Sequence, residues 1–314
     1  MSASSPAISS DLITTAAQAS LLLSEAGRRK IADYLRSCLH QAGGFCDRAG
    51  RPDLYYTVFG LSGLLALEQP IPQADRIRSF LESCGNPRNM SFVELISLIR
   101  CHHLLDAAGH PTPLSETRLQ AIINRIGQYR CQDGGFAHDG IHSEHSTLYA
   151  LFLIEQALRD LGQAAMIPAD PADLIARLAT PDGGYANHVG AGQGIATASA
   201  TAALLLAGQG RTRAAQNAVT FLESLRAPNG GYRASAATSL PDILATATAL
   251  YARARAGWPA PDGIDADAAF IERLWSDAGG FCGHPADAQP DVEYTFYALL
   301  ALGAIKRLHH DPTP

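Results

Sequence analysis

The sequence lacks two features that would point to particular classes of partner. It has no block or stripe of Lys and Arg, and its 24 basic residues are outnumbered by 30 acidic ones. This excludes nucleic acid as an expected partner. No uncharged apolar run approaches the roughly 18 residues of a membrane span, and the first 20 residues show no signal-peptide pattern. We therefore expect a cytoplasmic protein with no integral membrane segment.

Cysteine pairs in metal-binding or redox spacing are also lacking. The six cysteines are scattered along the chain, and no two of them form a CxxC pair. A chain of 314 residues with 47% hydrophobic content can bury a core without crosslinks. We therefore expect reduced thiols rather than disulfides.

What the sequence does have is a repeated glycine pair that is always followed by an aromatic residue. From the second pair onward the pairs are 47 to 49 residues apart. The first two pairs are 91 residues apart, which leaves room for a degenerate (worn) copy of the repeat near residues 84–90. A period of this length indicates one supersecondary unit stacked on copies of itself. The pairs are Gly43-Gly44-Phe45, Gly134-Gly135-Phe136, Gly183-Gly184-Tyr185, Gly230-Gly231-Tyr232 and Gly279-Gly280-Phe281.

Two kinds of segment alternate between the glycine pairs. Runs rich in Leu and Ala open at a threonine 12 to 15 residues after each pair, and such runs are typical of buried inner helices. These threonines are Thr57, Thr147, Thr197, Thr246 and Thr295, and the worn copy supplies a sixth run at 90–108. Stretches with one apolar stripe predict outer helices at 17–40, 73–83, 114–129, 171–178, 212–225 and 265–275.

Six outer and six inner helices in alternation predict an all-α fold, an α6/α6 barrel (α/α toroid) of six helical hairpins. We expect this single domain at 17–308, a disordered segment at 1–16 and a short tail at 309–314. An open solenoid is the alternative. The ring is favoured because neither end carries a polar capping repeat and the first and last copies share Gly-Gly-Phe-Cys. In a ring, the loops before the inner helices gather at one mouth.

The glycine pair, aromatic residue, loop and Pro-Asp-x-x-x-Thr string resemble the prenyltransferase and squalene-cyclase repeat. The resemblance covers 17–308, and the family includes protein prenyltransferase β subunits and class II terpene cyclases. It implies an apolar central funnel that holds an isoprenoid. Aromatic and small residues on the predicted inner helices agree with such a funnel, because rings offer π faces to an alkene or a carbocation. A filled core is the alternative.

The first mouth loop, GGFCDRAGRPDLYYT, is similar to the GGFxxRxxKxxDxCY stretch of protein prenyltransferase β subunits. The resemblance implies a diphosphate site. Two guanidiniums and a phenol near a helix N-terminus suit phosphate oxygens. Pairing of the arginines with Asp47 and Asp53 is the alternative. The candidate substrate- or diphosphate-binding residues are Arg48, Arg51, Asp53, Tyr55, Tyr56 and, from the sixth loop, Tyr294.

The zinc ligands of the prenyltransferases do not carry over. Their cysteine is replaced by Tyr55, Leu244 or Glu293 in the matching copies, and their histidine by Tyr56, Ala245 or Tyr294. The remaining aspartate alone cannot hold zinc. Zn²⁺ is therefore disfavoured, and the cofactor stays open with Mg²⁺ as the remaining candidate.

The sixth mouth loop, Asp291-Val292-Glu293-Tyr294-Thr295, resembles the Asp-x-Asp-Asp-Thr string of class II terpene cyclases. The resemblance implies that the middle acid protonates an alkene or an epoxide. Two carboxyls beside an apolar chamber would raise the pKa of one of them. Asp291 and Glu293 are the candidate catalytic residues. The alternative for Asp291, as for Asp53 and Asp242, is a helix N-cap four residues before the threonine.

The third mouth loop holds three histidines and two acidic residues between residues 138 and 145. His142, Glu144 and His145 are weak candidates for a metal site, and Glu144 and His145 for acid/base catalysis. An exposed rim is the alternative.

Together these features predict an isoprenoid-binding enzyme, terpene cyclase-like or prenyltransferase-like, that acts on a prenyl diphosphate in the barrel. The alternatives are a prenyltransferase β-like subunit that needs a helical partner, and a non-catalytic lipid-binding or scaffold barrel. A homo-oligomer is left open.

Overall fold

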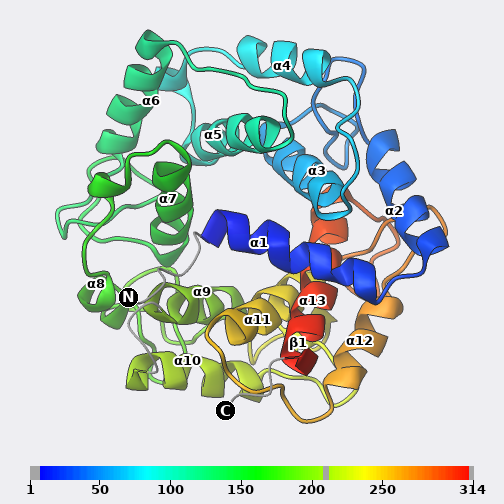
Figure 1. Cartoon of the computed structure of the whole chain (residues 1–314). Helices are drawn as coiled ribbons and strands as arrows, with labels where there is room; N and C mark the ends of the chain where they lie inside the picture. Colours follow the sequence, from blue (N-terminus) through cyan, green and yellow to red (C-terminus); the bar gives the residue numbers. More distant parts are fainter. Residues whose placement is uncertain (1–7, 208–211, 311–314) are drawn as a thin grey trace.

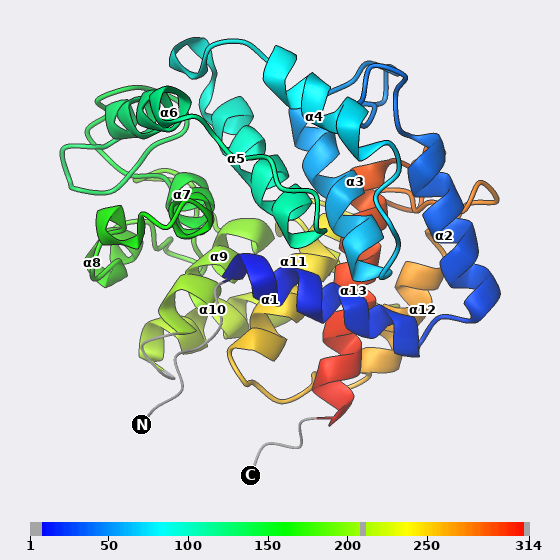
Figure 2. The same cartoon turned by 45° about the horizontal axis from the view of Figure 1, so that its top comes forward.

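The computed structural model describes residues 8–207 and 212–310 as a barrel of six helical hairpins (Figures 1 and 2). The predicted α/α toroid is confirmed. The outer helices are α2 (Glu25–Ser37), α4 (Ala74–Ser83), α6 (Glu116–Gln128), α8 (Ala172–Ala176), α10 (Arg213–Ser224) and α12 (Ile264–Glu272). The inner helices are α3 (Leu54–Ala66), α5 (Phe92–Ala107), α7 (Leu148–Asp160), α9 (Ala196–Leu206), α11 (Ile243–Arg255) and α13 (Val292–His310).

The inner helices form a closed ring. Each one contacts the next along the chain, and α13 returns to contact α3 (Figure 1). The open solenoid is therefore wrong. Closure brings the first and the sixth mouth loops together, as the ring prediction required.

The glycine pairs attach each hairpin to the outer helix of the next one. A Cβ atom on Gly44 would lie 2.7 Å from the ring of Phe80 in α4, and one on Gly231 would lie 2.7 Å from the ring of Phe270 in α12. Gly280 closes the circle in the same way, because a Cβ there would overlap the ring of Tyr34 in α2. The same repeated contact thus joins neighbours and closes the ring.

A hydroxyl on each of several inner helices fixes the glycine turn. Thr57, Thr246 and Thr295 accept the backbone N–H of the aromatic residue after the pair at 2.9, 2.9 and 3.1 Å. In the fourth hairpin Ser199 takes this role, at 3.0 Å from the N–H of Tyr185. The choice of Thr197 as the repeat threonine is therefore wrong by two residues.

The third hairpin departs from the pattern too. Thr147 is the N-cap of α7 and accepts the N–H of Ala150, rather than bonding to the glycine turn from inside the helix. Thr147 does open its inner helix, as predicted, but it stands four residues earlier relative to the helix than Thr57 does. Threonine suits either role, because its hydroxyl serves N-caps and turns alike.

Two short strands and three 3₁₀ turns complete the elements. Strands β1 (Tyr232–Arg233) and β2 (Pro241–Asp242) pair antiparallel before α11. The 3₁₀ turns are η1 (Gln18–Leu21), η2 (Pro87–Asn89) and η3 (Ala164–Met166). In the described part of the chain, no helix is both long and apolar enough to cross a bilayer.

The N-terminal segment differs from the prediction. Residues 8–17 form helix α1 (Ile8–Ala17), and α2 starts separately at the N-cap Ser24, so a single outer helix at 17–40 is wrong. The disorder expected for 1–16 is wrong for residues 8–16, and residues 1–7 lie outside the described residues. The helix is held by the buried carboxylate of Asp11, which binds Arg255 and Arg307 far along the chain. Local sequence does not show such contacts.

The glycine contact at the ring closure can be tested by adding one methyl group. We expect Gly280→Ala to lower the free energy of unfolding by about 1–3 kcal/mol, because the methyl overlaps the Tyr34 ring in a packed site. Gly127→Ala in α6 is the control: its Cβ meets no atom within 4 Å, so helix propensity should stabilise the protein by up to ~1 kcal/mol. Urea unfolding measures both. Equal effects would show that the Gly280 contact does not hold the ring.

Candidate active site

The site lies at the mouth, where the six inner helices begin. Asp53, Asp242 and Asp291 cap three of these helices through hydrogen bonds of 3.0, 2.7 and 2.8 Å from backbone N–H groups. The N-cap interpretation is confirmed for all three. Because each carboxylate is turned to its own helix end, none of the three is free in the barrel interior.

Arg48 joins the first mouth loop to the sixth. Its Nε donates to Asp291 at 2.7 Å and its Nη2 donates to Asp287 at 2.6 Å. The guanidinium also lies over the Tyr294 ring, 4.9 Å from its centroid. The side chain of Gln289 donates back to the carbonyl of Arg48 at 3.3 Å. Arg48 is thus a clamp across the closure of the ring.

The two candidate diphosphate ligands are both held by carboxylates. Arg51 donates to Asp47 at 2.8 Å, which is the pairing that the alternative described, while 77% of its side-chain surface stays exposed. Arg48 is bound by two acids of the sixth loop, and these same acids hold its pKa above the ordinary value despite desolvation. A diphosphate would have to displace two carboxylates from Arg48 but only one from Arg51.

The second residue of each inner helix occupies the same place in the repeat and is half-buried in all six hairpins. Equivalent positions in a closed ring surround the same opening, so these six side chains line the mouth of the interior. They are Tyr55, Val93, Tyr149, Thr197, Leu244 and Glu293. Glu293 is the one carboxyl group among these six residues.

Glu293 is held in a setting that favours its neutral form. The hydroxyl of Tyr55 donates to Glu293 Oε1 at 2.6 Å across the junction of α3 and α13. Burial raises the pKa of Glu293 to about 7, and the charge of Asp291 adds to this, whereas the Tyr55 hydrogen bond and Arg48 oppose it. Glu293 can therefore lose or gain a proton near neutral pH.

A group of aromatic rings continues from Tyr55, the partner of Glu293, into the barrel. Phe59 lies 4.9 Å from Tyr55 and 5.4 Å from Tyr297, measured between ring centroids, and Phe296 lies 5.9 Å from Phe59. Tyr297 is enclosed by protein, which raises its pKa, yet part of its surface is uncovered. An enclosed side chain with uncovered surface borders an internal space. The interior is therefore lined by rings and not completely filled.

Tyr149 faces Glu293 from the opposite side of the ring. It lies on α7, three inner helices away from α13 in either direction. Burial raises its pKa to about 12, and the next cause is the charge of Glu293. Tyr149 and Tyr297 belong to the aromatic residues of the predicted inner helices and were not among the candidate site residues. Their positions in the helices are the sequence signal that assigns them to the site. Tyr149 is the second residue of its inner helix, as Glu293 is, and Tyr297 lies four residues after Glu293.

The third mouth loop contributes a histidine that was not among the candidates. The His138 ring lies 5.1 Å from that of Tyr149, and its Nδ1 lies 2.8 Å from the Thr147 hydroxyl. By contrast, the side chains of His142, Glu144 and His145 are exposed. Within residues 8–207 and 212–310, neither Glu144 nor His145 contacts Asp291 or Glu293.

The residues at the site do not fit a metal ion. Asp291 is bound by Arg48 and by the Tyr294 N–H. The family ligand positions beside it carry Glu293, which accepts the Tyr55 hydroxyl, and Tyr294. Over the described ranges, no three His, Cys, Asp or Glu side chains gather as ligands, and this includes the weak candidates His142, Glu144 and His145. Grouping these three into a metal site therefore stays a prediction, and no third ligand among the described residues adds to it.

A pocket of about 390 Å³ opens beside the site, between the starts of α9, α11 and α13. Tyr294 and Leu244 both line the pocket, so it lies between the Tyr294 ring and the start of α11. His284 and Asp242 supply polar groups among mainly apolar neighbours. The mouth therefore offers room beside Tyr294 for part of a ligand.

Comparison with known structures supports the same fold. The chain is similar to Candida albicans protein geranylgeranyltransferase-I in complex with GGPP, with a TM-score of 0.66, 15% identity and coverage of 90% of this chain and 92% of that one. It is also similar to ent-copalyl diphosphate synthase from Streptomyces platensis, with a TM-score of 0.50 and 17% identity over 82% of this chain and 50% of that one.

A third similar structure has another activity. Unsaturated glucuronyl hydrolase from Bacillus sp. GL1 matches with a TM-score of 0.57 and 14% identity, over 94% of this chain and 96% of that one. Identities this low show a shared fold alone. The function must therefore be argued from the residues of the site.

Two comparisons were made at the level of sequence. No curated protein matches the chain. The model of the prenyltransferase alpha-alpha toroid domain matches residues 15–87, 81–195 and 130–311, which together span nearly the whole chain. With the closed ring of hairpins, this match identifies the chain as a member of the prenyltransferase alpha-alpha toroid domain family.

Proposed function

We propose that this protein is an enzyme that binds an isoprenoid in the barrel and transfers a proton to it from Glu293, as in a terpene cyclase-like reaction. The observation that carries the proposal is the position of Glu293. It is the one carboxyl in the ring of six mouth residues, it is hydrogen-bonded to Tyr55, and its pKa is about 7. A general acid works best when its pKa lies near the working pH.

The rings below Glu293 suit a cationic intermediate. Phe59, Phe296 and Tyr297 pack together, with Phe59 5.9 and 5.4 Å from the other two ring centroids, and the π face of an aromatic ring attracts positive charge. Burial keeps the Tyr297 hydroxyl protonated at all ordinary pH values. An apolar, aromatic interior is what an isoprenoid that develops positive charge requires.

The strength of the acid limits the group that it protonates. A carboxylic acid with a pKa of about 7 gives little driving force for protonating an isolated alkene. An epoxide oxygen is more basic and opens to a carbocation on protonation. We therefore propose an oxygen-bearing isoprenoid, such as an epoxide, as the substrate for cyclisation.

A carbohydrate substrate, suggested by the hydrolase among the similar structures, is less well supported. Sugars need many polar partners for their hydroxyl groups. The second ring of interior positions, one turn below Glu293, includes Phe59, Leu153 and Tyr297, together with the half-buried Thr201 and Thr248. The Thr248 hydroxyl already donates to the carbonyl of Leu244. This lining gives a sugar few of the hydrogen bonds that it would need.

Glu293→Gln tests the acid directly. We expect kcat to fall by about 10²–10⁴-fold, because the amide keeps the size of the side chain but cannot deliver a proton. The matched control is Glu82→Gln, which makes the same change on the exposed surface near the end of α4 and should leave turnover unchanged. Turnover of an epoxy-isoprenoid is the measurement. Full activity of Glu293→Gln would rule out this residue as the acid.

The pH profile tests the setting of Glu293. Because the protonated form is the active one, kcat/KM should be flat at low pH and fall as the pH rises through about 7. In Tyr55→Phe the hydrogen bond that lowers the pKa of Glu293 is lost, so the fall should move to higher pH. A profile that stays in place, or that rises through neutral pH, would contradict the assignment.

Substitution of Arg51 tests whether the substrate carries the expected diphosphate head group. Charge-assisted hydrogen bonds contribute about 1.5–3 kcal/mol each, so Arg51→Met should weaken the binding of farnesyl diphosphate at least about tenfold if Arg51 holds the head group. Arg29→Met, which also breaks an exposed ion pair with Glu25, is the control. Calorimetry measures the affinity. An unchanged affinity would favour a substrate without a diphosphate at this mouth.

A further inference from the structure

Helix α1 lies across the end of the barrel opposite to the mouth. It contacts α13, α3 and also α7, and α7 stands opposite to α13 in the ring. A single helix that touches opposite members of the ring must cross its opening (Figure 1). Its contacts with Tyr251, Arg255 and Arg307 lie toward the C-terminal ends of α11 and α13, far from the mouth.

The middle of α1 is fixed by a buried carboxylate. Asp11, only 6% exposed, accepts the Tyr251 hydroxyl at 2.9 Å and pairs with Arg255 at 3.0 Å and Arg307 at 3.1 Å. One turn further, the backbone of Thr15 packs so closely on α13 that a side chain at Gly303 would collide with its carbonyl oxygen. The helix therefore cannot move away from α13 without breaking buried ion pairs.

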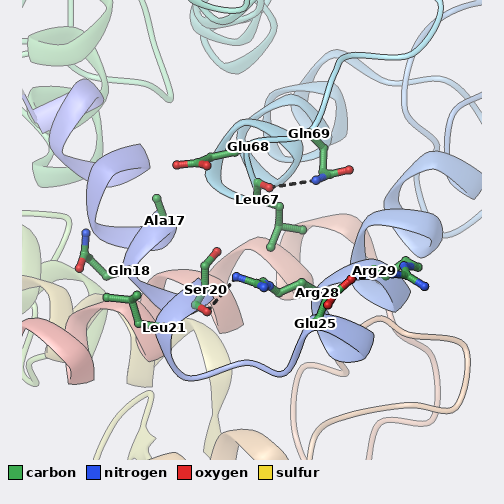
Figure 3. A pocket seen from close by; sticks show the side chains of 10 residues that line it. All are labelled: Ala17, Gln18, Ser20, Leu21, Glu25, Arg28, Arg29, Leu67, Glu68 and Gln69. Carbon is green, nitrogen blue, oxygen red and sulfur yellow. Dashed lines mark hydrogen bonds and ion pairs between the residues drawn. The ribbon is translucent and has the colours of Figure 1, made fainter.

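The C-terminal end of α1 is held as well. Arg28 donates to the carbonyl of Ser20 in η1 at 3.3 Å, close to the end of α3 at Leu67 (Figure 3). The pocket of about 550 Å³ at this place is bordered by the exposed side chains of Leu21 and Arg29. Ala17 and residues 67–69 after α3 also line it, so this pocket opens at the C-terminal end of α1 and is not lined by Leu12 (Figure 3).

Leu12 is the residue of α1 that is best placed to face the interior. Successive residues of a helix are about 100° apart, so Leu12 points between Thr15 and Ala16, with Asp11 beyond Thr15. These three neighbours are almost fully buried, yet Leu12 keeps part of its surface uncovered while it packs on the core. Uncovered surface in the middle of the buried face borders the barrel interior.

We infer that α1 is the floor of the substrate cavity and that Leu12 limits the length of the isoprenoid chain that fits. This inference rests on the proposed isoprenoid function. Glu293 at the mouth and Gly303 at the floor are separated by ten residues of one helix, or about 15 Å at 1.5 Å per residue. A chain that enters at the mouth ends against α1.

The test compares the affinities of geraniol, farnesol and geranylgeraniol, which share one chain type and lack a diphosphate. Leu12→Trp should weaken the longest alcohol that the wild-type protein binds by at least about tenfold, and change the shortest by less than about twofold. Leu12→Ala, which only removes atoms, should tighten binding of the next longer alcohol. Native mass spectrometry and fluorescence titration measure the affinities.

Thr14 supplies the matched control. It lies on the exposed face of α1, where its hydroxyl bonds the carbonyl of Ser10 at 2.9 Å, so Thr14→Trp and Thr14→Ala should leave every affinity unchanged. The inference that α1 is the floor would be wrong if Leu12→Trp weakened the binding of all three alcohols equally, or if Leu12→Ala left the limit on chain length unchanged. Failure of the wild-type protein to bind any of the three alcohols would instead overturn the isoprenoid function, and the floor with it.

Discussion

The structure depends on one repeated contact, the packing of a glycine pair against the outer helix of the next hairpin. Because the second glycine has no side chain, the ring of Phe80 or Phe270 reaches the turn and locks one hairpin to the next. The sixth hairpin makes this contact with Tyr34 of the first. Closure is thus the same interaction applied once more, and it brings Arg48 to Asp291, which are 243 residues apart.

Closure also explains how a repeat can build a single candidate site. The second residue of every inner helix lines the mouth, so the fold supplies six equivalent positions and the sequence varies what stands there. Glu293 occupies one of them. Asp291, two residues away, is committed to its helix end and to Arg48. The two acids that look alike in the sequence therefore have different partners, and Glu293 is the one that accepts the Tyr55 hydroxyl.

What could be predicted from the sequence depends on whether the partners of a residue lie in its own hairpin or in another one. The glycine period predicts the hairpins and the closed ring, because each copy carries its own turn and helix. Residues whose partners lie in another hairpin were harder to assign. Arg48 was expected to face a diphosphate, but closure surrounds it with Asp287 and Asp291. Helix α1 was missed for the same reason, since Asp11 meets Arg255 and Arg307 only in the folded barrel.

The placement of Glu293 constrains the chemistry beyond its acidity. Glu293, Arg51 and the opening all lie at one end of the barrel, and α1 crosses the other. An extended chain therefore cannot hold a diphosphate on Arg51 and also present its far terminus to Glu293. With a head group at the mouth, Glu293 would stand beside the first carbons and would act as a base in transfer. With the reacting terminus at the mouth, it would act as the acid in the cyclisation that we propose. The neutral form favoured by burial fits the second arrangement.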